Sequence, residues 1–213
     1  MTMLNFHVLD ARGHLSGDRD WLLDRLRAAY ASAAPLLPLG PLDVVLRAGD
    51  RVIPEKGHLG YAPEAGRIEI VVDPANPALR DNRAASLERM FAHELHHAAR
   101  WEGPGYGATL GEALVSEGLA GQFSYALYGP PVEPWDALPM NEVRAHFDRA
   151  AEDWTSGYDH ARWFFGTGDL PRWLGYSIGY LLVGRLLSTA AGLSAAGLVH
   201  APALRFRAGL KMA

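Results

Sequence analysis

The chain has 213 residues, of which 49% are hydrophobic and 21% charged, a composition typical of one globular domain with a substantial core. Its net charge of -4 and its pI near 6.1 argue against nucleic acid or an anionic membrane as a partner. Because it contains no cysteine, disulfides and thiolate metal ligands are excluded, and a zinc ion would need histidine and carboxylate ligands. We therefore expect one domain over residues 1–213. The first ten residues lack the basic and long apolar regions of a signal peptide, which predicts a cytoplasmic protein.

The first third of the chain is predicted to form a small sheet. Apolar, β-branched runs indicate strands over residues 6–9, 42–46 and 68–72. Residues 57–63 contain two glycines and a proline, which favour a hairpin arm or a loop. Residues 18–34 show helical periodicity, with a buried stripe expected at Trp21, Leu22, Leu26, Ala29 and Tyr30. The remainder of the chain is predicted to be almost purely helical.

The segment from Asn82 to Trp101 is predicted to be one helix, and it carries His-Glu-x-x-His at residues 93–97. Residues four apart share a helix face, so the imidazoles of His93 and His97 can bind one metal ion. Glu94 is rotated about 100° from His93, which places its carboxylate outside the ligand set but near a metal-bound water. His96 is expected to support a ligand or to lie at the surface, because only the 93/97 pairing leaves Glu94 in the general-base position.

A third metal ligand is needed, because a catalytic zinc usually takes three protein ligands. The next helix is predicted to run from a Thr109 cap through Phe123, and it carries two carboxylates. Glu117 is the preferred ligand, because antiparallel helices with a short Gly-Pro connection bring it beside His97. Glu112 is the rival on a different face. The alternative is that Glu117 is an ordinary solvated helix carboxylate.

Glycines at 111, 118 and 121 weaken that helix by roughly 1 kcal/mol each relative to alanine. Close packing against the metal-binding helix is expected to offset this cost, because residues without side chains let two backbones approach.

The C-terminal third is predicted to contain short helices joined by loops. Residues 128–139 are proline-rich and indicate a surface connection, after which a helix is expected to begin at Met140. The aromatic side chains between residues 154 and 173 are expected in the core or in a cleft wall. Residues 174–187 are too few for a membrane span and predict a buried helix.

Two tyrosines on that last helix are candidates to donate a hydrogen bond to a developing oxyanion. Tyr176 and Tyr180 are four residues apart and share a face; Tyr176 is the first choice, Tyr180 the second and Arg172 the third. The alternative is that both tyrosines are ordinary core residues.

Residues 175–179 also match G-x-S-x-G, the serine-hydrolase elbow, around Ser177. That class needs an acid and then a histidine later in the chain. No Asp or Glu follows Ser177, so the match is interpreted as accidental.

Three motifs in order resemble those of a bacterial family of predicted zinc-dependent proteases, the DUF2268 or YjaZ-like group. They are His93–His97, Ser116–Ala120 and Pro171–Tyr180. The resemblance covers most of the chain from about Gly57 onward.

Membership of that family implies a gluzincin-like enzyme whose zinc is bound by His93, His97 and Glu117. One position departs from this pattern. Thermolysin-type gluzincins carry an aspartate four residues after the ligand glutamate to hold a histidine, and this chain has Gly121 there. Gln122 is suggested as the substitute.

We therefore predict an α+β fold, in which a small N-terminal sheet precedes a mainly helical zincin-like domain, and the activity of a zinc metallopeptidase. The expected partner is a peptide or protein substrate, without nucleic acid or stable membrane insertion. A peptide is expected to add as a strand to residues 68–72. The alternative is a zinc-binding scaffold without hydrolytic activity, in which no exchangeable water reaches the metal.

Overall fold

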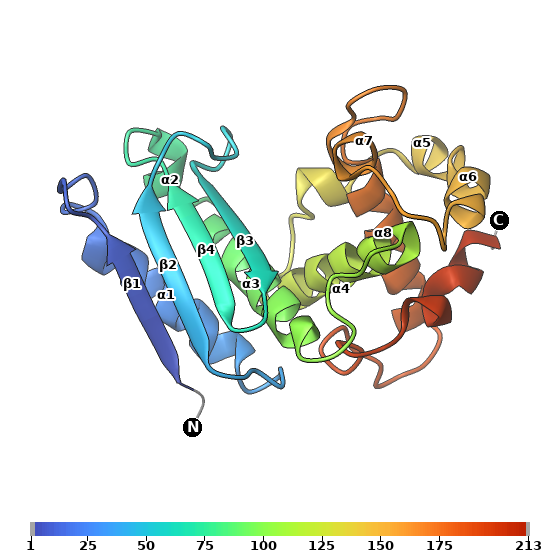
Figure 1. The fold of residues 1–213 in the computed structure, drawn as a ribbon, viewed down its shortest axis with the longest axis horizontal. Coiled ribbons are helices and arrows are strands. Elements are labelled where there is room, and N and C mark those ends of the chain that lie inside the picture. Colours follow the sequence, from blue (N-terminus) through green and yellow to red (C-terminus); the bar gives the residue numbers. More distant parts are fainter. Residues whose placement is uncertain (1–2, 212–213) are drawn as a thin grey trace. The chain divides into compact units, whose positions relative to one another are not determined.

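The computed structural model describes residues 3–211, and the chain divides into two compact units, one ending at Glu102 and the other beginning at Gly103. The first unit contains every strand among the described residues, and the second is helical (Figure 1). The predicted α+β class, with a sheet near the N-terminus and a mostly helical remainder, is confirmed. A single domain over residues 1–213 stays a prediction.

The first unit is built on a four-stranded mixed sheet in the order β1-β2-β4-β3. Its strands are β1 (Leu4–Leu9), β2 (Leu42–Ala48), β3 (His58–Glu64) and β4 (Arg67–Val72). β1, β2 and β4 are parallel, and β3 is antiparallel to β4. The three strand predictions and the hairpin arm at residues 57–63 are thus confirmed. Alternate residues of β2 are buried and exposed, as expected for a sheet with one covered face.

The strand order corrects the prediction that a peptide adds to residues 68–72. β4 lies between β2 and β3 and is hydrogen-bonded on both sides. No edge of β4 remains for another strand. The edges of the sheet belong to β1 and β3.

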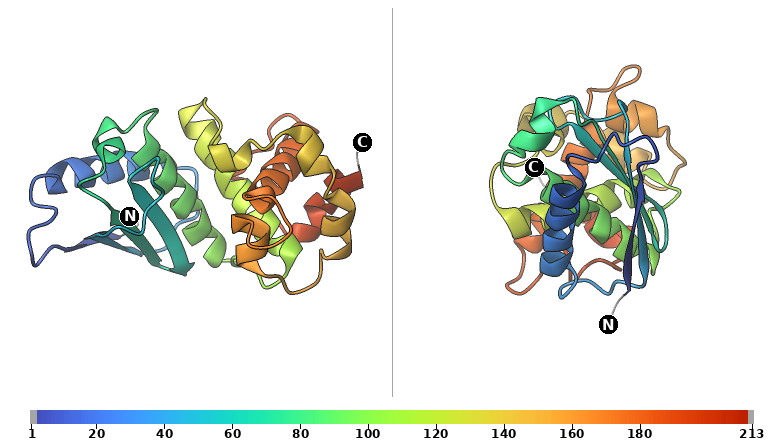
Figure 2. Two further views of the ribbon diagram at one scale, coloured as in Figure 1. Left: turned by 90° about the horizontal axis from the view of Figure 1, so that it is seen from above. Right: turned by 90° about the vertical axis from the view of Figure 1, so that its left-hand side faces the viewer.

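Two long helices, α1 (Arg19–Ala33) and α3 (Ser86–Trp101), cover one face of this sheet and pack on each other (Figure 2). In α1 the predicted stripe is buried at Leu22, Leu26 and Ala29, whereas Trp21 and Tyr30 are only half-buried. The guanidinium of Arg80 lies over the ring of Trp21, 4.8 Å from its centroid, which explains why that ring stays near the surface.

The predicted start of the metal-binding helix at Asn82 is wrong by four residues, while its end at Trp101 is confirmed. Asn82 instead terminates α2 (Pro77–Asp81) in a left-handed conformation, and Ala84 and Ala85 also have positive φ, 53° and 55°. The Asn82 Oδ1 accepts a hydrogen bond from the backbone N–H of Leu87 at 2.9 Å. This side chain therefore separates the two helices and satisfies a free N–H at the start of α3.

The second unit surrounds the helix α4 (Leu110–Tyr128), which is buried along most of its length. The other elements are η1 (Pro134–Asp136), α5 (Met140–Arg144), α6 (Phe147–Glu152), α7 (His160–Phe165), α8 (Leu174–Leu187) and η2 (Ala203–Lys211). The helix expected from Met140 is therefore divided into two short ones. The predicted helix over residues 174–187 is confirmed. Of the aromatic side chains expected in the core or a cleft wall, Trp154, Trp163 and Phe164 are buried, whereas Trp173 is half-buried and Phe165 is exposed, so the prediction is wrong for Phe165.

Within this unit the glycines of α4 pack against a different partner from the one expected. A Cβ on Gly118 would collide with the backbone carbonyl of Gly179 in α8, and a Cβ on Gly111 would collide with the ring of Trp154. The close approach predicted for α4 is real, but α8 provides the neighbouring backbone. Among residues 3–211 we find no helix with the length and apolar character that crossing a membrane requires.

Candidate metal centre

Two imidazoles on α3 face each other one helical turn apart. The Nε2 atoms of His93 and His97 are 3.0 Å apart, and the ring planes meet at 76° with centroids 4.7 Å apart. Two nitrogen ligands of a tetrahedral zinc, each about 2.0–2.1 Å from the ion, are themselves about 3.3 Å apart. The pair therefore fits two corners of a zinc site with almost no rearrangement.

The carboxylate between them is held close to the sheet. A Cβ placed on Gly60 of β3 would lie 2.6 Å from the Cγ of Glu94, so only glycine lets the strand pass this side chain. Because β3 is an edge strand, Glu94 lies directly behind one margin of the sheet. His96 is fully buried, so its predicted surface placement is wrong; a supporting role for it stays a prediction.

The carboxylate predicted as third ligand is oriented by a phenol in its own unit. The Oη of Tyr106 donates a hydrogen bond of 2.6 Å to the Oε1 of Glu117. Burial raises the pKa of Tyr106 well above its ordinary value, and the negative charge of Glu117 adds to this effect. Tyr106 could not be predicted from the sequence, because its distance along the chain from Glu117 does not indicate that this loop tyrosine bonds a residue on the following helix.

Further aromatic side chains gather near Glu117. His160 stacks on Phe164 with ring centroids 4.5 Å apart and planes at 14°. Burial lowers the pKa of His160, while the charge of Glu117 acts in the opposite direction. Tyr176 meets the same Phe164 edge-on at 4.9 Å and is close enough to Tyr106 to help raise its pKa. We call Tyr106, His160, Phe164 and Tyr176 the aromatic cluster.

A family model described as a predicted Zn-dependent protease (DUF2268) matches residues 29–207. The chain belongs to this family. The match includes all three motifs that resemble this family in the sequence: the first lies on α3, the second on α4, and the third runs from the preceding loop into α8. A search among curated proteins finds no match.

The other candidates for oxyanion stabilisation in this DUF2268 protein have different neighbours. The ring of Tyr180 packs edge-on against Tyr125, with centroids 6.4 Å apart. Arg172 is exposed, and its guanidinium lies over the ring of Trp173 at 4.4 Å. Tyr176 is thus the candidate that joins the aromatic cluster.

Gly121 stands where thermolysin-type enzymes carry an aspartate, and it faces a carboxylate from another part of the chain. A Cβ on Gly121 would lie 3.0 Å from the Oδ2 of Asp136 in η1. Gln122, the suggested substitute, points toward α8 instead, where its Nε2 donates to the carbonyl oxygen of Tyr180 at 3.0 Å. The carboxylate beside Gly121 is therefore that of Asp136, and sequence spacing gave no sign of it.

Hydrogen bonds indicate structural roles for Glu112, the rival metal ligand, and for Ser177, the alternative nucleophile. Glu112 completes the capping box predicted at Thr109, and its Oε2 accepts from the backbone N–H groups of Ala108 and Thr109, both at 3.0 Å. It is a helix cap rather than a ligand. Ser177 is buried in α8, where its Oγ donates to the carbonyl of Trp135 at 2.7 Å and accepts from the N–H of Leu138 at 3.1 Å. Its hydroxyl ties η1 to α8, which favours a structural role for Ser177.

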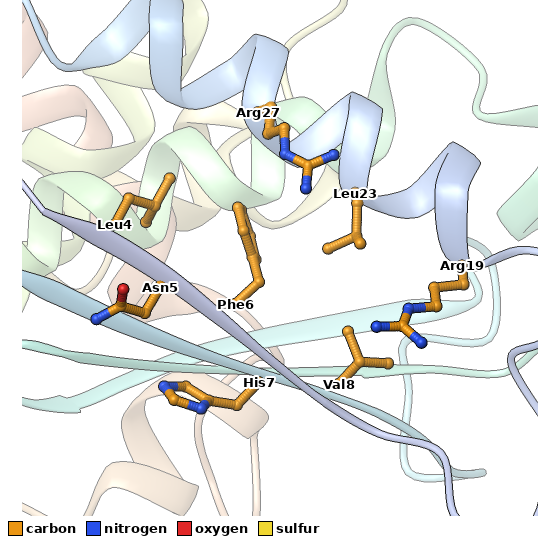
Figure 3. A pocket seen from close by; sticks show the side chains of 8 residues that line it. All are labelled: Leu4, Asn5, Phe6, His7, Val8, Arg19, Leu23 and Arg27. Carbon is orange, nitrogen blue, oxygen red and sulfur yellow. The ribbon is translucent and has the colours of Figure 1, made fainter.

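An open hollow of about 540 Å³ lies between β1 and α1 in the first unit (Figure 3). Phe6 of β1 and Leu23 of α1 line it with apolar side chains, and Arg19 and Arg27 of α1 also line it. Its only imidazole, that of His7, is hydrogen-bonded to Asp43 at 2.7 Å. The hollow is lined by none of the motif residues and forms no part of the candidate centre.

Proposed function

We propose that the protein is a zinc metallopeptidase of zincin-like, gluzincin type, which hydrolyses peptide bonds and binds its metal through His93, His97 and Glu117. The observation that carries the proposal is the His93–His97 pair, whose Nε2 atoms are separated almost as two ligands of one zinc would be. Two imidazoles and one carboxylate are also a ligand set of known zinc peptidases, with one position left for water. The description of the family as predicted zinc-dependent proteases supports the same function.

The chain connection is compatible with this ligand set. Residues 102–109 join α3 to α4, and eight residues in extended form reach about 26 Å. His97 lies in the last turn and a half of α3, and Glu117 lies two turns into α4. The connection is therefore long enough for both helices to contribute ligands to one ion.

Glu94 is the proposed general base. A bound zinc would lower the pKa of a coordinated water and polarise the peptide carbonyl. Glu94 accepts the proton from the attacking water and then donates it to the departing amine, so the residue ends the cycle as a carboxylate. Tyr176 donates a hydrogen bond to the carbonyl oxygen as negative charge develops there, with Tyr180 as the second candidate.

Hydrolysis that depends on zinc is the test of this function. We expect the zinc-loaded protein to cleave casein or a peptide library, a chelator to stop cleavage, and added zinc to restore it. In the same assay Tyr176→Phe should lower kcat by about 10²–10³-fold, the range for one lost oxyanion donor, and Tyr180→Phe by much less. A protein that binds zinc and cleaves none of these substrates would instead be the non-hydrolytic scaffold.

A further inference from the structure

We propose that Tyr106 is a positioning residue for the proposed metal ligand Glu117: its phenol holds Oε1 and so fixes the orientation in which this carboxylate would meet a zinc ion. The inference rests on the proposed function, because it takes Glu117 as a ligand. It adds a residue that neither the motifs nor the description of the family contains.

The hydrogen bond itself is of the strong kind. At 2.6 Å, the Tyr106 Oη to Glu117 Oε1 distance falls within the range of about 2.5–2.7 Å that is typical of O–H donors on a carboxylate. Bonds of this kind are roughly twice as strong as neutral ones. A carboxylate held at one oxygen cannot rotate freely about its last torsion, and its second oxygen therefore has a defined direction.

The loop that presents Tyr106 is attached to the start of the helix that carries Glu117. Gly105 and Gly107 flank the tyrosine with φ of 72° and 100°, conformations that glycine adopts without strain. A Cβ on Gly107 would lie 3.0 Å from the Oε2 of Glu112, so the loop packs directly on the capping glutamate. Because Glu112 also binds the N–H groups of residues 108 and 109, the loop that carries the phenol is attached to the first turn of the helix that carries Glu117.

Outer partners of metal ligands affect the metal itself. Removing a group that orients a ligand typically weakens metal binding by about 10–100-fold. Without the phenol, the Glu117 carboxylate can turn and bind with both oxygens or leave the ion. The same change should therefore alter both zinc affinity and the coordination geometry.

Tyr106→Phe tests the inference, since it removes only the hydroxyl. Competition with a chromophoric chelator should show zinc bound about 10–100-fold more weakly than by the wild type. In the cobalt-substituted protein the visible absorption bands, which report coordination number, should change as well. Tyr125→Phe is the matched control, because it also removes one phenol hydroxyl, here from a tyrosine on α4 whose ring packs against Tyr180. It should leave both the zinc affinity and the cobalt absorption bands unchanged. Unchanged zinc affinity in Tyr106→Phe would overturn the inference.

A double-substitution cycle separates this inference from the proposed function. In a Glu117→Ala background, Tyr106→Phe should cause no further loss of zinc affinity, because the phenol acts through that carboxylate. A further loss would mean that Tyr106 acts on the fold, and would overturn the positioning role while leaving Glu117 as a ligand. If Glu117→Ala alone binds zinc as tightly as the wild type, the ligand set of the proposed function fails first.

Discussion

Glu94→Gln is expected to lower kcat/KM for the proposed peptide hydrolysis by about 10²–10⁴-fold while zinc remains bound, because positioned general bases contribute that much to proton transfer. Glutamine has nearly the volume of glutamate, so it fits beneath Gly60 in the same space. It cannot accept the proton of an attacking water at neutral pH. The measurement is initial-rate kinetics on one cleaved peptide, together with the zinc content of both proteins.

Glu88→Gln is the matched control for this substitution. Glu88 lies on the same helix, and its carboxylate accepts from the side chain of Asn82 at 2.8 Å, a bond that a glutamine oxygen can also accept. Its kcat/KM should stay at the wild-type value. Equal hydrolysis by Glu94→Gln and the wild type would remove Glu94 from the mechanism.

The facing of the two imidazoles on α3 could be predicted because it depends only on spacing within one helix. The spacing of four residues from His93 to His97 places the two imidazoles on one face once the segment is helical, and their Nε2 atoms are 3.0 Å apart in the structure. The start of that helix was wrong because Asn82 caps from outside it, and local propensity does not reveal whether an asparagine joins a helix or ends another.

Contacts between distant parts of the chain were the ones that could not be predicted. The hydrogen bond from Tyr106 to Glu117 depends on the conformation of a glycine-rich loop, and the carboxylate of Asp136 reaches Gly121 from a separate turn. Likewise, small residues on α4 indicated a close neighbour without specifying that α8 provides it. Strand order is a further case: β3 returns outside β4, which leaves residues 68–72 with no free edge.

The other prediction with a large effect concerns the ligands themselves. His97→Ala and Glu117→Ala should each weaken zinc binding by more than the 10–100-fold that is typical of supporting residues, because each removes a direct bond to the ion. Glu152→Ala is the control, since this carboxylate is exposed on α6 and the account gives it no part in the metal site. It should leave zinc binding intact.

Zinc stoichiometry, measured by elemental analysis after dialysis against trace zinc, tests the metal-binding assignment most directly. We expect about one zinc per chain in the wild type and in Glu152→Ala, and almost none in His97→Ala and Glu117→Ala. A wild-type protein that retains no zinc, or a Glu117→Ala variant that retains it fully, would contradict the account.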